Sequence, residues 1–134
     1  MSTQPRLLIT DQDFHRLTAL VSQIDGPQAD ALDEELSRAD VVSHREIPSD
    51  VVTMNSRVRF LDETNHHESE LTLVYPQDAR LEDNRISILA PVGVALLGLK
   101  VGETIDWKMP NGALKKLKVL QIEFQPEASG QFDL

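Results

Sequence analysis

Apolar residues recur at helical spacing through the first 47 positions of the chain. Phe14, Leu17, Val21 and Ile24 form one seam with spacings of three and four residues, and a second seam follows after a short turn. A stripe with this period is typical of an amphipathic helix that buries one face. The pattern predicts two short helices whose seams face each other in an antiparallel hairpin. The second seam consists of Ala29, Leu32, Leu36 and Ala39.

Local signals set the ends of these two helices. Thr10, followed three residues later by Asp13, has the spacing of a capping box. Gly26 is expected to end the first helix and Pro27 or Gln28 to begin the second, so the tip of the hairpin is Asp25, Gly26, Pro27 and Gln28. Helices of about 13 residues make an arm about 20 Å long. The preceding Leu7-Leu8-Ile9 either adds a strand or packs beneath the hairpin.

From Pro48 onward the pattern changes to short strands separated by turns. Pro110-Asn111-Gly112 predicts the last hairpin turn. One apolar helix, Val92 to Leu97, follows Pro91 and is closed by glycines. The fold class is therefore α+β, with an N-terminal helical hairpin in residues 1–47 and, in residues 48–134, a mostly antiparallel sheet covered by one short helix. The expected strands are 51–53, 58–60, 70–75, 85–88, 104–108 and 117–124.

Charge and composition narrow the classes of function. The chain has 22 acidic and 13 basic residues and a net charge of −9. This balance argues against a surface that grips nucleic acid phosphates, so we expect no direct sequence-specific nucleic-acid binding. It favours a basic partner, or serves only solubility. The absence of cysteine excludes disulfides and thiol catalysis. Without a signal peptide pattern or an apolar run of roughly 20 residues, we expect a cytoplasmic protein that does not associate with membranes.

No group of residues predicts catalytic or metal chemistry. His66 and His67 lie with Glu63 and Glu68 in a polar run between two strands, which is typical of a surface turn. Neighbouring side chains on an extended strand point to opposite faces, so the pair is a poor metal site. The acidic run Asp33-Glu34-Glu35 is interpreted as a solvated helix face. We therefore predict no catalytic residue, no metal and no cofactor.

Four segments carry a resemblance to a known family. They are Asp50–Val58, Ala90-Pro91-Val92-Gly93, Ala95–Leu99 and Phe124–Ala128. The chain resembles the Gre transcript-cleavage factors, whose C-terminal domain is FKBP-like. It is still more similar to one subfamily of that group, the regulator of nucleoside diphosphate kinase. The resemblance covers essentially the whole chain, and Asp50–Val58 is its most specific part.

The resemblance implies a partner and a docking loop. Members of the group bind RNA polymerase near its secondary channel, with the FKBP-like domain at the channel rim and the helical arm pointing inward. The docking loop implied here consists of Ile88, Leu89, Ala90, Pro91 and Val92. Gre factors carry Ser-Pro where this chain has Ala90-Pro91, so one hydroxyl contact would be missing. The alternative interpretation of these residues is ordinary packing at a helix start.

The tip of the arm departs from the Gre pattern. Gre factors carry an Asp and a Glu, three residues apart, on a longer hairpin that helps hold magnesium at the polymerase active site. If Asp25 matches the Asp, the neutral Gln28 stands in place of the Glu, and an amide lacks the negative oxygen that Mg²⁺ favours. The expectation is a regulator, not an enzyme, that stimulates no transcript cleavage and competes with Gre factors.

Two other functions stay open. One is an adaptor for a partner other than polymerase, since an effect on nucleoside diphosphate kinase levels could be direct or transcriptional. The other is a peptidyl-prolyl isomerase, because those enzymes share the FKBP-like fold. Their pocket is lined by aromatic residues, and this chain offers few, among them Phe60, Tyr75 and Trp107. The oligomeric state is open, with a monomer favoured.

Overall fold

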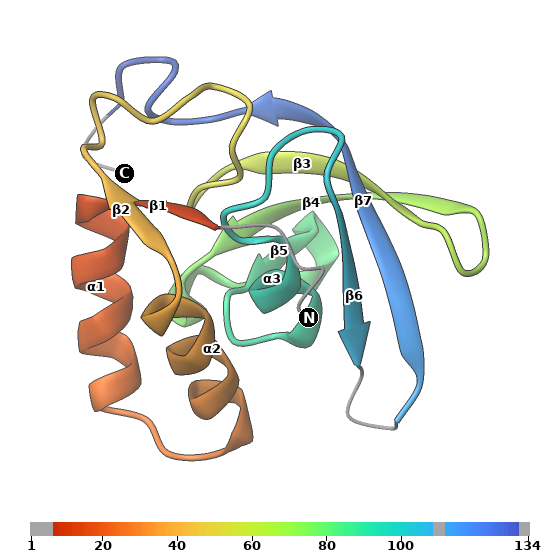
Figure 1. Cartoon of the computed structure of the whole chain (residues 1–134), viewed down its shortest axis with the longest axis horizontal. Coiled ribbons are helices and arrows are strands. Elements are labelled where there is room, and N and C mark those ends of the chain that lie inside the picture. The colour runs from red at the N-terminus through yellow and green to blue at the C-terminus, as the bar shows by residue number, and fades with distance from the viewer. Residues whose placement is uncertain (1–6, 109–111, 132–134) are drawn as a thin grey trace.

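The N-terminal part of the chain is built from two helices between two short strands. The computed structural model describes residues 7–108 and 112–131. The two strands pair in parallel, with Ile9 opposite Val41, and the helices pack against each other (Figure 1). The two alternatives for Leu7-Leu8-Ile9 therefore both hold, because this segment enters a strand and its Leu7 and Ile9 are also buried. The elements are β1 (Leu8–Thr10), α1 (Asp11–Ser22), α2 (Pro27–Ser37) and β2 (Asp40–Val42).

The second part of the chain forms a five-stranded sheet with the order β5-β4-β3-β7-β6. The β4–β5 pair is parallel and the other pairs are antiparallel. The expected strand at 51–53 is wrong, since Val51 makes only an isolated bridge with Lys100. Pro110 and Asn111 of the expected hairpin turn lie outside the described residues. The strands are β3 (Arg57–Asp62), β4 (His67–Val74), β5 (Arg85–Ser87), β6 (Thr104–Lys108) and β7 (Leu114–Phe124), and two 3₁₀ turns, η1 (Pro76–Asp78) and η2 (Leu81–Asp83), precede β5.

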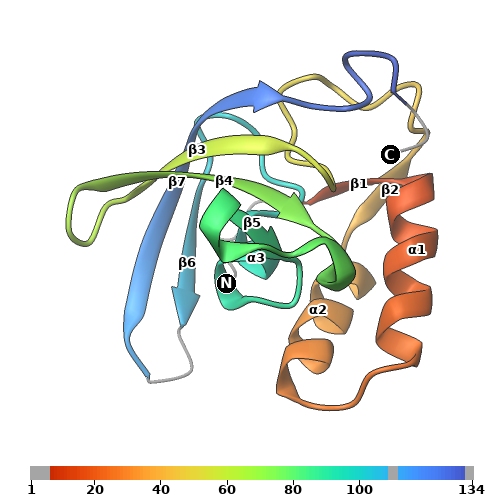
Figure 2. The ribbon, with the colours of Figure 1, turned by 180° about the vertical axis from the view of Figure 1, so that it is seen from behind.

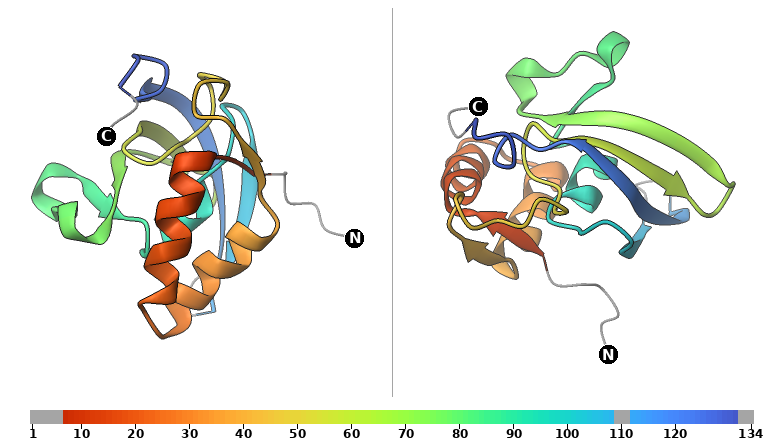
Figure 3. Two further views of the ribbon diagram at one scale, coloured as in Figure 1. Left: turned by 90° about the vertical axis from the view of Figure 1, so that its left-hand side faces the viewer. Right: turned by 90° about the horizontal axis from the view of Figure 1, so that it is seen from above.

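Helix α3 (Pro91–Leu96) lies under the arch of this sheet (Figures 1 and 3). It carries the chain from β5 at one edge to β6 at the other. The approach between α3 and the sheet depends on Gly93. A Cβ atom at Gly93 would lie 2.7 Å from the carbonyl oxygen of Ser87 and 3.0 Å from Cδ1 of Leu73. Only glycine permits so close a contact of backbone with backbone.

One apolar core joins the two parts of the chain. Leu17 and Leu32 of the helices are buried in the same cluster as Leu73 of the sheet and Leu96 of α3. The helical part therefore shares its core with the sheet part, and α2 is in contact with α3, whereas α1 lies at the outer edge of the molecule (Figure 2). The division at residue 47 stays a prediction. None of the helices in residues 7–108 and 112–131 has the length and apolar character needed to cross a bilayer.

Strand β7 is less regular than its sequence suggests. Simple alternation places Leu117, Val119 and Gln121 on one face. Leu117 and Val119 are buried as expected, but Gln121 is exposed and Ile122 packs against the core instead. The pairing with β3 shifts register twice, and such bulges change which residues face inward. The prediction for Gln121 is therefore wrong because a bulge, which alternation does not reveal, precedes it.

Candidate functional site

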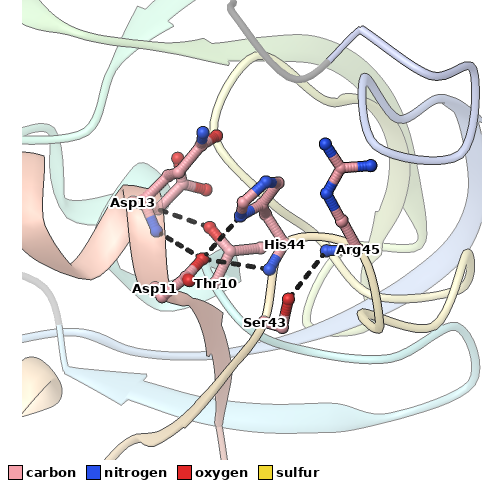
Figure 4. A network of polar contacts seen from close by, with 7 residues as sticks. Thr10, Asp11, Asp13, Ser43, His44 and Arg45 are labelled. Carbon is pink, nitrogen blue, oxygen red and sulfur yellow. Dashed lines mark hydrogen bonds and ion pairs between the residues drawn. The ribbon is translucent and has the colours of Figure 1, made fainter.

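The start of α1 is joined to the sheet part through a buried carboxylate. Thr10 caps the helix, because its hydroxyl accepts a hydrogen bond of 3.0 Å from the backbone N–H of Asp13 (Figure 4). The Asp13 carboxylate accepts a hydrogen bond of 3.0 Å from the backbone N–H of Met54. The hydroxyl of Tyr75 lies 3.5 Å from the other carboxylate oxygen. One half of the expected capping box is therefore present, the bond from the Asp13 N–H to the Thr10 hydroxyl. The Asp13 side chain does not return to Thr10 and binds the remote Met54 instead.

The environment of Asp13 shifts its protonation. The residue is only 4% exposed. Burial raises the pKa of Asp13 from an ordinary 3.8 to about 6, and the nearby charge of Glu127 adds to the rise. The hydrogen bond from Met54 and the positive charge of Arg16 act in the opposite direction. The carboxylate at this joint therefore gains a proton within two pH units of neutrality.

The most specific segment of the sequence, Asp50–Val58, contains a tight turn that presents the Met54 N–H to Asp13. The Ser56 hydroxyl accepts a hydrogen bond of 3.0 Å from the N–H of Thr53 and lies 2.8 Å from the Thr53 hydroxyl. Asn55 has a φ of 65°, a left-handed conformation that asparagine tolerates. Its N–H donates to the carbonyl of Leu73 at 2.6 Å, which fixes the turn on β4.

The C-terminal segment Phe124–Ala128 holds the same turn from its other side. The Gln125 side-chain amide donates to the carbonyls of Pro48 and Val51, both at 2.8 Å. The Thr53 hydroxyl donates to the Glu127 carboxylate at 2.8 Å. Two segments that carry the resemblance, far apart in sequence, are therefore in direct contact. With Asp13 they join the beginning, middle and end of the chain.

A second contact at the start of α1 fixes the segment that leaves β2. The Asp11 carboxylate accepts from the backbone N–H of His44 at 3.0 Å and lies 2.9 Å from Nδ1 of its ring (Figure 4). The side-chain hydrogen bond from His44 lowers the pKa of Asp11. This contact connects α1 to the linker through which the chain passes from the helical part to the sheet part.

The expected docking loop, Ile88 to Val92, is a turn anchored on β4 and Ser87. The N–H of Ile88 donates to the carbonyl of Val74 at 2.8 Å, and the N–H of Leu89 donates to the Ser87 hydroxyl at 3.0 Å. Ile88 is fully buried, so its side chain positions the loop and cannot reach a partner. Leu89, Ala90, Pro91 and Val92 are half-buried and offer the loop's surface.

Ala90 is the N-cap residue of α3, and it has no side chain that could cap the helix. Its backbone has the extended conformation of an N-cap, with φ of −68° and ψ of 145°. Serine is strongly preferred at such a position because its hydroxyl accepts from a free helix N–H. Gre factors have a serine at this position. Its hydroxyl would cap α3, in addition to any contact with a partner.

The expected tip of the arm joins α1 to α2. Of the two predicted starts of α2, the structure has Pro27, whereas Gly26, with φ of 120°, is the N-cap of α2 and not the end of α1. Helix α1 already ends at Ser22, where the N–H of the following Gln23 bonds to two carbonyls of the last turn. Asp25, Pro27 and Gln28 are exposed. Because α2 packs against α3, the helical pair and the docking loop lie on the same side of the sheet (Figure 2).

The residues of the candidate acidic run differ in their exposure, whereas His66 and His67 are both exposed. Asp33 and Glu34 are exposed, but Glu35 is buried and binds Arg38 at 2.6 Å, so the expectation of a solvated run is wrong at Glu35. Its carboxylate faces inward because it follows Leu32 by three residues on the same helix face. Within the part of the chain that the structure describes, no three His, Asp or Glu side chains gather as metal ligands would.

Comparison with known proteins connects this architecture to transcription. The family described as "Transcription elongation factor, GreA/GreB, C-term" matches residues 47–124, and the family described as "Rnk N-terminus" matches residues 5–42. A solved structure described as a prokaryotic transcription elongation factor GreA/GreB from Nitrosomonas europaea has a TM-score of 0.73 and 45% identity, covering 90% of this chain and 100% of that one. The mixed α+β class is confirmed, and the fold is that of a GreA/GreB-like transcription factor.

The sequence relatives narrow the class further. A regulator of nucleoside diphosphate kinase from Escherichia coli is 44% identical over 133 residues, which are 97% of this chain and 98% of that protein. The transcription elongation factor GreA of Caldanaerobacter subterraneus is 42% identical over 91 residues, 68% of this chain and 57% of that protein. The chain belongs to the regulator of nucleoside diphosphate kinase family within the GreA/GreB group. These relatives are named as regulators and elongation factors.

Proposed function

We propose that this protein binds RNA polymerase at the rim of the secondary channel, competes there with Gre factors and stimulates no transcript cleavage. The observation that carries the proposal is the loop before α3. Leu89 to Val92 form a half-buried apolar surface, and the hydrogen bonds to Val74 and Ser87 hold its backbone in place. A preformed apolar turn of this kind binds a partner at low cost in conformational entropy.

The orientation of the complex follows from the same assignment. The sheet part, residues 48–134, acts as an FKBP-like domain that docks through this loop, and the helical pair in residues 1–47 acts as a short coiled-coil arm that points into the channel. The protein acts as a monomer in the cytoplasm. Its influence on nucleoside diphosphate kinase levels is then a consequence of transcription.

The tip of the arm carries the negative half of the proposal. Asp25 is the one carboxylate among Asp25, Gly26, Pro27 and Gln28, and Gln28 offers an amide. Mg²⁺ prefers anionic oxygen ligands, so this tip lacks half of the expected ligand pair. Helix α1 has 12 residues and α2 has 11, which limits each to about 18 Å. Both features argue that the protein occupies the channel rim without bringing a metal ion to the polymerase active site.

Competition for core RNA polymerase tests this function. We expect the protein to comigrate with polymerase in gel filtration and to reduce the transcript cleavage that a Gre factor stimulates, in proportion to its concentration. The combined variant Leu89→Asp and Pro91→Asn should lose this competition, because a charge at the half-buried Leu89 opposes docking on an apolar surface.

The control is Leu114→Asp, which introduces the same charge at an apolar residue that is 64% exposed and far from the loop in sequence. Circular dichroism establishes that all variants are folded, and Pro91→Asn alone serves if the double variant is not. Competition that survives in a folded docking variant would contradict the docking assignment, and absence of polymerase binding by the wild type would contradict the function.

The second candidate is an adaptor that binds nucleoside diphosphate kinase directly. The net charge of −9 favours binding to a partner that presents a basic surface. Retention of the kinase, and not of polymerase, on a column of the immobilised protein would identify the adaptor. Such a contact should weaken as salt rises, because screening reduces interactions between exposed charges.

A further inference from the structure

The docking loop, Ile88 to Val92, is anchored at its beginning by Ser87, the last residue of β5. The Ser87 hydroxyl accepts a hydrogen bond of 3.0 Å from the N–H of Leu89, and the Ser87 carbonyl accepts one of 2.9 Å from the N–H of Ala90. A serine side chain that bonds to the backbone two residues ahead closes a tight turn. Two successive N–H groups of the loop therefore end on Ser87.

The backbone of Ser87 is itself fixed by two neighbours. Val74 of β4 lies opposite Ser87 in the parallel pair, and the carbonyl of Val74 accepts from the N–H of Ile88 at 2.8 Å. Helix α3 packs closely on the same residue, because a Cβ atom at Gly93 would lie 2.7 Å from the Ser87 carbonyl oxygen. The hydroxyl is therefore the part of this anchor that a substitution can remove while the backbone contacts stay in place.

The sequence gives the loop no second hydroxyl. Ser87 is the one serine, threonine or tyrosine in residues 87–92. Ala90, the N-cap of α3, has no side chain that could accept from the first turn of the helix. The shape of the loop therefore depends on the bond between the Ser87 hydroxyl and the partly buried N–H of Leu89. Without that acceptor the N–H would be left unsatisfied, which favours other conformations of the loop.

We propose that Ser87 is the positioning residue of the docking loop: its hydroxyl holds Leu89 in the conformation in which Leu89 to Val92 meet RNA polymerase. The inference rests on the function proposed above. Ser87 acts through the backbone of Leu89 and needs no contact of its own with polymerase. A loop that is competent to bind only part of the time has an affinity lower by that fraction. Loss of the hydroxyl should therefore weaken binding by about fivefold, the factor that corresponds to one ordinary hydrogen bond.

Two variants of the full chain test this role. Ser87→Ala removes the hydroxyl, and Ser87→Thr keeps it on a residue that suits a strand. In the protein alone, amide hydrogen exchange at Leu89 should be about fivefold faster in Ser87→Ala than in the wild type, and Ser87→Thr should restore the slow rate. In competition with a Gre factor for core polymerase, Ser87→Ala should need about fivefold more protein for the same inhibition of cleavage, and Ser87→Thr should act like the wild type.

Ser43→Ala is the matched control. The Ser43 hydroxyl accepts a hydrogen bond of 3.2 Å from the N–H of Arg45, also two residues ahead, in the linker after β2 (Figure 4). This substitution removes the same kind of bond outside the docking loop. We expect Ser43→Ala to keep the Leu89 exchange rate and the polymerase affinity of the wild type.

Circular dichroism establishes that the variants are folded, and Ser87→Cys, whose sulfur is a weak acceptor, serves if Ser87→Ala is not. Unchanged Leu89 exchange or wild-type competition in the folded variant, or a Ser87→Thr that restores neither, would overturn the proposal. Equal losses of affinity in Ser87→Ala and Ser43→Ala would show a general destabilisation and overturn it as well. A wild type that binds no polymerase would contradict the proposed function, and Leu89 exchange in the protein alone would then decide the role of Ser87 by itself.

Discussion

Asp13 shows how one residue takes on a role that its local sequence does not reveal. Its position three residues after Thr10 suggests a reciprocal cap, yet its carboxylate bonds to Met54, 41 residues further along the chain. The side chain is buried beside Tyr75, Arg16 and Glu127. A buried carboxylate with a raised pKa favours the folded state most when it is protonated. The joint between α1 and the turn at Met54 is therefore weakened by ionisation.

The variant Asp13→Asn tests this account. Asparagine keeps an acceptor for the Met54 N–H and removes the charge. Because the folded pKa of about 6 lies above the ordinary 3.8, the stabilising contribution of Asp13 is complete below about pH 4 and is lost as the pH rises through 6. The difference in unfolding free energy between Asp13→Asn and wild type should therefore grow in favour of the variant by up to about 3 kcal/mol from pH 4 to pH 7.

Urea unfolding at a series of pH values measures this difference. Asp11→Asn is the comparison variant, because the bond from His44 lowers the pKa of Asp11 and its contribution has the opposite sign. A pH-independent difference between Asp13→Asn and wild type would mean that Asp13 is not desolvated in the folded protein.

At the scale of elements, α3 combines a tight contact with an incomplete start. Gly93 allows the helix to touch the backbone at Ser87, and Ala90 leaves the first N–H groups of the helix without a side-chain acceptor. A six-residue helix derives little stability from its own hydrogen bonds, so packing and capping decide whether it forms. The loop that we assign to docking thus also contains the start of this helix, which has no side-chain cap.

Ala90→Ser should raise the stability of the protein by about 1 kcal/mol, because the hydroxyl accepts a hydrogen bond from the first turn of α3. For a chain of this size we expect the melting temperature to rise by about 4 °C in a thermal scan. Polymerase affinity, measured in parallel, separates two roles of the hydroxyl. A higher melting temperature with unchanged affinity identifies a cap, whereas higher affinity at unchanged melting temperature would identify a direct contact and contradict the capping account.

Periodicity predicts the elements whose partners are near in sequence. The seams through Leu17 and Leu32 place both helices, and Pro91 with Gly98 delimits α3. Periodicity fails where a residue's main hydrogen-bond partner is far away in the sequence. Residues 51–53 have the β-branched composition of a strand, but Thr53 is committed to the Ser56 turn and to Glu127, so no ladder forms. The contact of Asp13 with Met54 could not be predicted either, because only the fold brings these two segments together.

In the whole molecule, the helical pair is packed into the common core. Its tip can therefore extend only a short distance from the sheet part. Gln28→Glu restores the second carboxylate of the Gre pattern at the tip. We still expect no stimulated cleavage in stalled elongation complexes, because helices of about 18 Å limit the distance to which the tip extends. A Gre factor in the same assay is the positive control. Cleavage by Gln28→Glu above the wild-type level would mean that charge, and not reach, is limiting.

The place of β7 in the sheet has a consequence for the synthesis of the protein. This strand lies between β3 and β6, is the pairing partner of both, and is made by the ribosome after the other strands that the structure describes. Until it emerges, β6 has no neighbour and β3 has only one. The β3–β7 pair joins residues 57–62 to residues 117–124. Pairing between segments so far apart in sequence is slow. The sheet of the nascent chain therefore stays incomplete during synthesis until β7 has emerged from the ribosome.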